Sequence, residues 1–183
     1  IIAPNEERVL LHASNNKKKK RVQDVVKIFA SVNKQIPSKL LFIGDGPERS
    51  TAEDLARELG VGEEIRFVGK QEQMEDILAI GDLFLLTSEY ESFGLAALEA
   101  MAAGVPVVST NAGGLSEINV DGKTGFMSNV GDVESMSKQA LEILKNDDTL
   151  KRFKENAAAH AKIFINENAT RLSGIFIMVF LCS

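Results

Sequence analysis

The 183-residue sequence contains one cysteine, Cys182, no tryptophan and only two histidines. A single cysteine excludes an intrachain disulfide and fits a reducing, cytoplasmic location. No apolar run approaches the roughly 20 residues that cross a bilayer, and no basic stretch followed by an apolar one opens the sequence, so we expect neither a membrane span nor a signal peptide. No set of His, Cys and Asp has metal-ligand spacing and no Ser-His-Asp or Cys-His set can be assembled, so we expect no metal and no other cofactor.

Positive charge is also in the minority. The sequence has 21 Lys and Arg against 26 Asp and Glu, which gives a net charge of −5. Binding to a nucleic-acid backbone usually needs a net basic face, so this charge argues against nucleic acid as the main partner. A hydrophobic content of 44% over this length supports one well-packed domain.

Short apolar runs alternate with stretches in which apolar residues recur at helical spacing. The predicted strands cover residues 9–14, 40–43, 65–68, 83–86, 105–108 and 125–127. The predicted helices cover residues 21–35, 50–60, 74–80, 95–103, 132–145 and 149–164, and a capping box at 50–53 opens the second. This order predicts an α/β fold, a doubly wound parallel sheet of Rossmann-like type, which binds ligands beyond the carboxyl ends of its strands. Residues 1–164 are predicted to form this domain, and residues 165–183 an atypical tail.

Two carboxylates stand out near the predicted helix 95–103. Glu99 is the only charge in a helix made otherwise of Leu, Ala and Met, which predicts a buried helix. A buried carboxylate needs a partner, either a donor within the protein or the hydroxyl pair of a ligand. Glu91 precedes it by eight positions, in the loop before the helix, so both carboxylates can face the same crevice.

Positive potential is expected at the same crevice. The helix start at Phe93, Gly94 and Leu95 offers free backbone N–H groups, which suit a phosphate, although Gly94 can also be explained as a tight turn. Residues 17–21 carry five positive charges just before another helix, where cations oppose the helix dipole. The run is either a solvated surface or a site for an anion bound over the strand ends.

These residues resemble a known family. Glu91 and Glu99 fit the E-x7-E motif of the retaining glycosyltransferases of the GT-B fold called family four, and segments 44–47, 99–106 and 113–117 follow in the family's order. The resemblance covers residues 5–164. Segments 14–15, 20–26 and 69–71 are most similar to members that transfer N-acetylglucosamine from UDP-N-acetylglucosamine to L-malate in bacillithiol biosynthesis.

The resemblance implies a set of roles around a UDP-sugar donor. Glu99 would bind the ribose hydroxyls and Glu91 a hydroxyl of the donor sugar. Lys20 would bind the diphosphate, with Lys17 at the position where the family has an arginine. The remaining implied donor-binding residues are Ser14, Gly44, Val68, Phe93, Gly94 and Leu95.

The resemblance also implies a two-domain enzyme of which this sequence matches the nucleotide-sugar-binding half. The acceptor would be held mainly by the other half, so the chain alone is expected to bind donor without transferring sugar. No metal is expected to take part. Two alternatives stay open: a nucleotide-sugar epimerase or phosphorylase of the same fold, and a non-catalytic nucleotide-binding module. The sequence leaves a homo-oligomer open.

Overall fold

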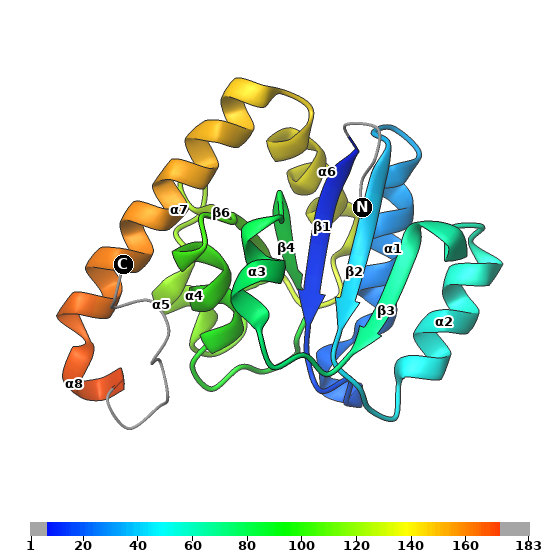
Figure 1. Cartoon of the computed structure of the whole chain (residues 1–183), viewed down its shortest axis with the longest axis horizontal. Helices are drawn as coiled ribbons and strands as arrows, with labels where there is room; N and C mark the ends of the chain where they lie inside the picture. Colours follow the sequence, from blue (N-terminus) through cyan, green and yellow to red (C-terminus); the bar gives the residue numbers. More distant parts are fainter. Residues whose placement is uncertain (1–6, 173–183) are drawn as a thin grey trace.

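The computed structural model describes residues 7–172 and shows one six-stranded parallel sheet between two layers of helices (Figure 1). The strands are β1 (Arg8–Ala13), β2 (Ser38–Ile43), β3 (Ile65–Gly69), β4 (Leu83–Leu86), β5 (Val107–Thr110) and β6 (Gly125–Ser128). The helices are α1 (Val22–Asn33), α2 (Arg49–Glu58), α3 (Met74–Ala79), α4 (Leu95–Ala102), α5 (Leu115–Ile118), α6 (Val133–Leu144), α7 (Asp147–Glu167) and α8 (Ala169–Leu172), with 3-10 turns η1 (Lys18–Lys20) and η2 (Gly62–Glu64).

The strand order is β3-β2-β1-β4-β5-β6, with every neighbouring pair parallel. The chain therefore winds outward from β1 in one direction and then from β4 in the other. Crossovers in such sheets are helical, which places helices on both faces. The predicted doubly wound α/β fold is confirmed.

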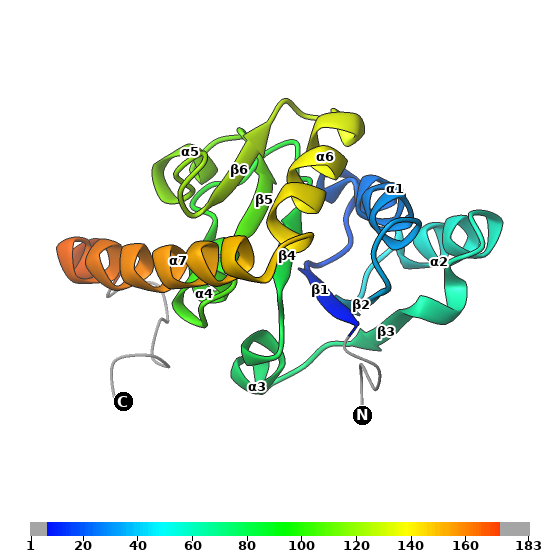
Figure 2. The same ribbon diagram turned by 90° about the horizontal axis from the view of Figure 1, so that it is seen from above.

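The core has two halves, one on each face of the sheet (Figure 2). Side chains alternate between them along each strand: Leu10 packs under α1 and α6, whereas Val9 and Leu11 pack under α4 and α7. The apolar runs of the inner strands β1, β2, β4 and β5 are buried on both faces for this reason, whereas the edge strands β3 and β6 are only partly buried. Among the described residues, no helix is both long and apolar enough to span a membrane.

Several predicted boundaries are corrected by the structure. The capping box at 50–53 does not form, because α2 already begins at Arg49, whose Nε donates to Glu53. Strand β5 begins at Val107 rather than at residue 105. Helix α7 runs three residues past the predicted end at 164, and Ile165 is buried against the core. Most of the predicted tail, residues 173–183, lies outside the described residues.

Candidate donor-binding site

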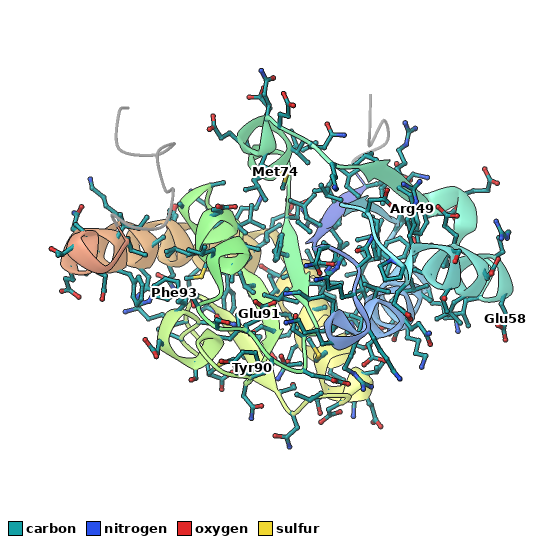
Figure 3. All side chains as sticks on the ribbon, turned by 90° about the horizontal axis from the view of Figure 1, so that it is seen from below. Arg49, Glu58, Met74, Tyr90, Glu91 and Phe93 are labelled. Carbon is teal, nitrogen blue, oxygen red and sulfur yellow. The ribbon has the colours of Figure 1, made fainter. Side chains whose placement is uncertain are left out.

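The candidate site lies where the strand order reverses. Strand β1 sits between β2 and β4, so the loops after β1 and β4 leave the sheet in opposite directions and open a crevice at its carboxyl edge. A cavity of about 290 Å³ occupies this place. Its lining residues are Ala13, Ser14, Asn15, Lys20, Glu91, Ser92, Phe93, Gly94, Leu95 and Ala96. Figure 3 looks onto this edge and shows Glu91 and Phe93 in the loop that enters α4.

The structure brings together six of the ten predicted site residues in this lining: Ser14, Lys20, Glu91, Phe93, Gly94 and Leu95. The other four, Lys17, Gly44, Val68 and Glu99, are not among the lining residues. Lys17 is exposed, together with Lys18 and Lys19. The run of basic residues is therefore divided: three lysines face solvent and Lys20 turns toward the cavity.

Lys20 and Glu91 form an ion pair across the cavity floor, although 71 positions separate them. The Lys20 and Glu91 side chains are only 14% and 16% exposed. Glu91 Oε1 accepts a second hydrogen bond from the hydroxyl of buried Ser88 at 2.8 Å. Two residues expected to meet different parts of a donor thus contact each other in the free protein.

Ser14 connects the cavity wall to a buried histidine. His12 Nδ1 lies 2.9 Å from the Leu85 carbonyl and Nε2 lies 2.9 Å from Ser14 Oγ, which is also 2.9 Å from Asn16 Oδ1. Burial lowers the pKa of His12 to about 4, so the ring is neutral at pH 7. Because Nδ1 faces a carbonyl, it must carry the hydrogen of the neutral ring, and Nε2 must accept. His12 Nε2 and Asn16 Oδ1 are therefore both acceptors, and they compete for the one hydroxyl hydrogen of Ser14. Ser14 therefore offers no hydroxyl donor to the cavity, and its backbone N–H is already bonded to the Ile43 carbonyl at 3.1 Å.

The start of α4 supplies backbone N–H groups at the cavity. Gly94 is its N-cap, with φ at +77° and no side chain capping the helix. This left-handed conformation favours glycine, and a Cβ at Gly94 would in addition lie 2.9 Å from Leu115 Cδ2, so that the leucine side chain would have to shift. The first N–H groups of an uncapped helix carry partial positive charge and suit an anion.

Glu99 lies one turn further along α4 and differs from its prediction in one respect. It is half-buried, as are Leu95 and Ala96, because one side of α4 borders the cavity edge instead of packing on the sheet. The prediction of a helix buried on all sides is therefore wrong. Within residues 7–172 no side chain pairs with the Glu99 carboxylate, and burial raises its pKa above the ordinary value.

Gly44 lies next to the loop after β1, whereas Val68 lies in β3, which β2 separates from β1. A Cβ at Gly44, where φ is +108°, would stand 1.8 Å from the Ser14 carbonyl oxygen. The Gly44 N–H donates to the Gly69 carbonyl at 2.8 Å, and the Val68 carbonyl accepts from Gln71 Nε2 at 2.7 Å. Close packing between the loops after β1 and β2 is sufficient to require glycine at position 44, so this glycine is not evidence of a ligand contact.

The glycine pair after β5 holds the Glu91 loop in place. Gly114 N–H donates to the Glu91 carbonyl at 2.8 Å, and a Cβ at Gly113 would lie 2.1 Å from that same oxygen. The two glycines thus form a support under Glu91, a role that their place in the family's order does not indicate. The sequence analysis also missed Ser88, which no motif indicated because its role depends on a contact in the folded chain.

Two other hollows among the described residues are less suited to a ligand. The larger of these two, of about 790 Å³, lies at the opposite edge of the sheet, beside Arg8 at the start of β1 and Pro37 before β2. Ligands of doubly wound sheets bind at the carboxyl edge, which favours the smaller cavity. The third, of about 200 Å³, lies beside α1 and contains Arg21 already paired with Asp24 and Glu89. Among the described side chains, no group of three His, Cys, Asp or Glu could hold a metal ion.

Comparison with known proteins decides the family. The model described as "Glycosyl transferases group 1" matches residues 2–160. This chain belongs to that family. The match spans both loops that line the cavity, and it confirms the resemblance drawn from the glutamate spacing.

Individual relatives agree with this family. The N-acetyl-alpha-D-glucosaminyl L-malate synthase of Bacillus anthracis is 44% identical over 151 residues, which cover 82% of this chain and 40% of that enzyme. The sulfoquinovosyl transferase SQD2 of Arabidopsis thaliana is 37% identical over 134 residues, which cover 70% of this chain and 26% of that protein. The chain thus spans less than half the length of these curated relatives.

Solved GT-B glycosyltransferases share the fold. A mutant of S. aureus TarM in complex with fondaparinux, alpha-GlcNAc-glycerol and UDP matches with a TM-score of 0.82 and 22% identity, over 91% of this chain and 35% of that one. Anabaena Alr3699/HepE in complex with UDP matches with a TM-score of 0.80 and 25% identity, over 92% of this chain and 49% of that one. The Rossmann-like architecture of this glycosyltransferase domain is thereby confirmed.

Proposed function

We propose that this chain is the nucleotide-sugar-binding domain of a retaining glycosyltransferase, and that its cavity holds the diphosphate and sugar of a UDP-sugar. The observation that carries the proposal is the placement of Lys20, Glu91 and the uncapped start of α4 around one cavity at the reversal of strand order. Family membership supports it.

The chemistry of the cavity suits a departing nucleoside diphosphate. Breaking the bond between the sugar and the diphosphate places negative charge on the leaving oxygen. Lys20 and the first N–H groups of α4 supply positive potential in a partly enclosed space, which stabilises that charge. We infer that Glu99 binds the ribose hydroxyls, since it is half-buried with no protein partner in the described part of the chain.

The finer part of the proposal concerns the substrates. We infer UDP-N-acetylglucosamine as donor and a small acceptor such as L-malate for the full-length protein. The 44% identity to a synthase of N-acetyl-glucosaminyl L-malate supports this pair. Because the chain spans 40% of that relative, we expect it to bind donor without transferring sugar, and we expect the acceptor to be held mainly by the remainder.

A ligand series on the 183-residue chain tests the proposal. Titration calorimetry with UDP, UDP-N-acetylglucosamine, UDP-glucose, GDP and ADP is expected to show the tightest binding for UDP-N-acetylglucosamine. Absence of heat with all five nucleotides would favour a non-catalytic interaction module. With the full-length protein, a changed sugar in the absence of any acceptor would point to an epimerase instead.

A further inference from the structure

One carboxylate oxygen of Glu91 contacts two side chains of unequal mobility. Glu91 Oε1 accepts from Lys20 Nζ and from Ser88 Oγ. The ammonium group of Lys20 lies at the end of a flexible four-carbon chain, whereas Ser88 is fully buried and its short side chain cannot move with a ligand. Of the two contacts, only the one with Lys20 can be exchanged without moving the backbone.

The backbone around this carboxylate is fixed independently of Lys20. Thr110 Oγ1 donates to the Ser88 carbonyl at 2.7 Å, and the Gly114 N–H donates to the Glu91 carbonyl at 2.8 Å. Strand β5 and its loop therefore hold both residues from below. If Lys20 leaves, Ser88 still positions the carboxylate of Glu91.

A diphosphate would compete with Glu91 for Lys20. It carries more negative charge than one carboxylate, and the start of α4 favours an anion in the same cavity. Lys17, Lys18 and Lys19 directly precede Lys20 in the chain, are exposed and form no ion pair within residues 7–172, so they add long-range attraction for the incoming anion.

We propose that the Lys20–Glu91 ion pair is exchanged when the donor binds, and that Ser88 is the positioning residue that then keeps Glu91 directed at the sugar. Lys20 transfers to the diphosphate, and the freed Oε1, still held by Ser88, accepts from a sugar hydroxyl. Diphosphate binding thereby prepares the sugar subsite. This inference rests on the proposed function.

The first test is Glu91→Gln on the 183-residue chain, with UDP as the probe. The glutamine keeps the shape but no longer holds Lys20 by charge, so UDP is expected to bind about two- to fivefold more tightly, the fold-change that corresponds to losing a competing ion pair of up to about 1 kcal/mol. The matched control is Glu89→Gln. It removes the same charge from the same loop, but Glu89 is half-exposed and pairs with Arg21, which stays bound to Asp24.

A double-mutant cycle separates exchange from general repulsion. The gain from Glu91→Gln is expected to shrink toward that of Glu89→Gln in the Lys20→Met background, since no ion pair remains to be broken. An equal gain in both backgrounds, or an equal gain for the two glutamate variants, would overturn the inference while leaving UDP binding intact. If the wild-type chain binds no UDP, the proposed function and the inference fall together.

The second test addresses Ser88 through the affinity ratio of UDP-N-acetylglucosamine to UDP. Ser88→Ala is expected to leave UDP affinity within about twofold and to reduce the ratio at least threefold, because the carboxylate loses its remaining donor. Ser137→Ala is the control, since Ser137 is a buried serine of α6 that bonds to the Val133 carbonyl and is not among the residues that line the cavity. A ratio unchanged in Ser88→Ala would show that Ser88 does not position Glu91. A general loss of folding would instead lower both affinities together, and the Glu91→Gln cycle would then decide.

Discussion

Replacing Glu99 by glutamine is expected to change stability and binding in opposite directions. Glu99 is half-buried, burial raises its pKa, and no described side chain donates to it. An ionised group that lacks a partner destabilises the fold, so Glu99→Gln should raise the free energy of unfolding at pH 7. If ribose hydroxyls donate to this carboxylate, the same variant should weaken UDP binding by about 1–3 kcal/mol, the usual worth of hydrogen bonds to a charged group.

The pH dependence follows from the direction of the shift. The pKa of Glu99 in the folded chain lies above its ordinary value of 4.5, so the folded chain holds a proton that the unfolded chain has released just above pH 4.5. Stability due to this group therefore falls as pH rises through that window. Hydroxyls that donate to the ionised form lower the pKa in the complex, so ligand binding should release a proton from Glu99 in the same window.

Calorimetry at pH 5 in buffers of different ionisation enthalpy measures this proton release. Uridine is used beside UDP, because phosphate groups titrate near pH 6 and uridine has none. The release should be present in the wild-type chain and in Glu89→Gln, and absent in Glu99→Gln. The ribose role is refuted if Glu99→Gln binds both ligands as the wild type does. Thermal unfolding without ligand tests the predicted gain in stability. A Glu99→Gln variant that is less stable than the wild type would contradict the reasoning about burial.

Two further predictions concern buried positions near the cavity. The unfolding free energy should fall by up to about 3 kcal/mol as pH drops from 6.5 toward 4, since unfolding lets His12 take up a proton at its ordinary pKa while the buried ring resists until about 4. Urea titrations across this range should show a smaller fall for His12→Asn, and parallel profiles would contradict the prediction. Gly113→Ala should destabilise the chain by more than the roughly 1 kcal/mol expected of Gly122→Ala. Both glycines have positive φ, but only the Cβ at Gly113 would strike backbone, the Glu91 carbonyl, so equal losses in urea denaturation would show that this contact relaxes freely.

The sheet could be predicted because its inner strands are buried on both faces and appear as continuous apolar runs. All six predicted strands are present in the described chain, within two residues of their expected starts. The difference at β5 has a local cause. Pro106 has no N–H to donate, so it contributes only its carbonyl, which accepts from the Phe84 N–H of β4 at 2.9 Å. Strand β5 therefore begins at the next residue, Val107.

Helix burial was harder to predict, because composition does not tell which face of a helix meets the sheet. Helix α4 is almost wholly Leu, Ala and Met, which predicts burial on all sides. In the structure Ala97, Leu98 and Met101 are buried, whereas Leu95 borders the cavity. A helix beside a binding cavity and a helix in a core can have the same composition, and only the neighbouring loops distinguish them.

The Lys20–Glu91 pair shows the same limit for charges. Composition treats residues 17–21 as one basic run, yet backbone geometry divides it. The 3-10 turn η1 is followed by Arg21 in the left-handed region, at φ +49°. Thr87 Oγ1 fixes this turn by sharing its one hydroxyl hydrogen between the Lys20 carbonyl at 2.8 Å and the Arg21 carbonyl at 3.1 Å. These bonds come from the end of β4, which pairs with β1 in the sheet. The lysine that faces the cavity is therefore selected by long-range pairing of two strands, a contact that no local pattern in the sequence contains.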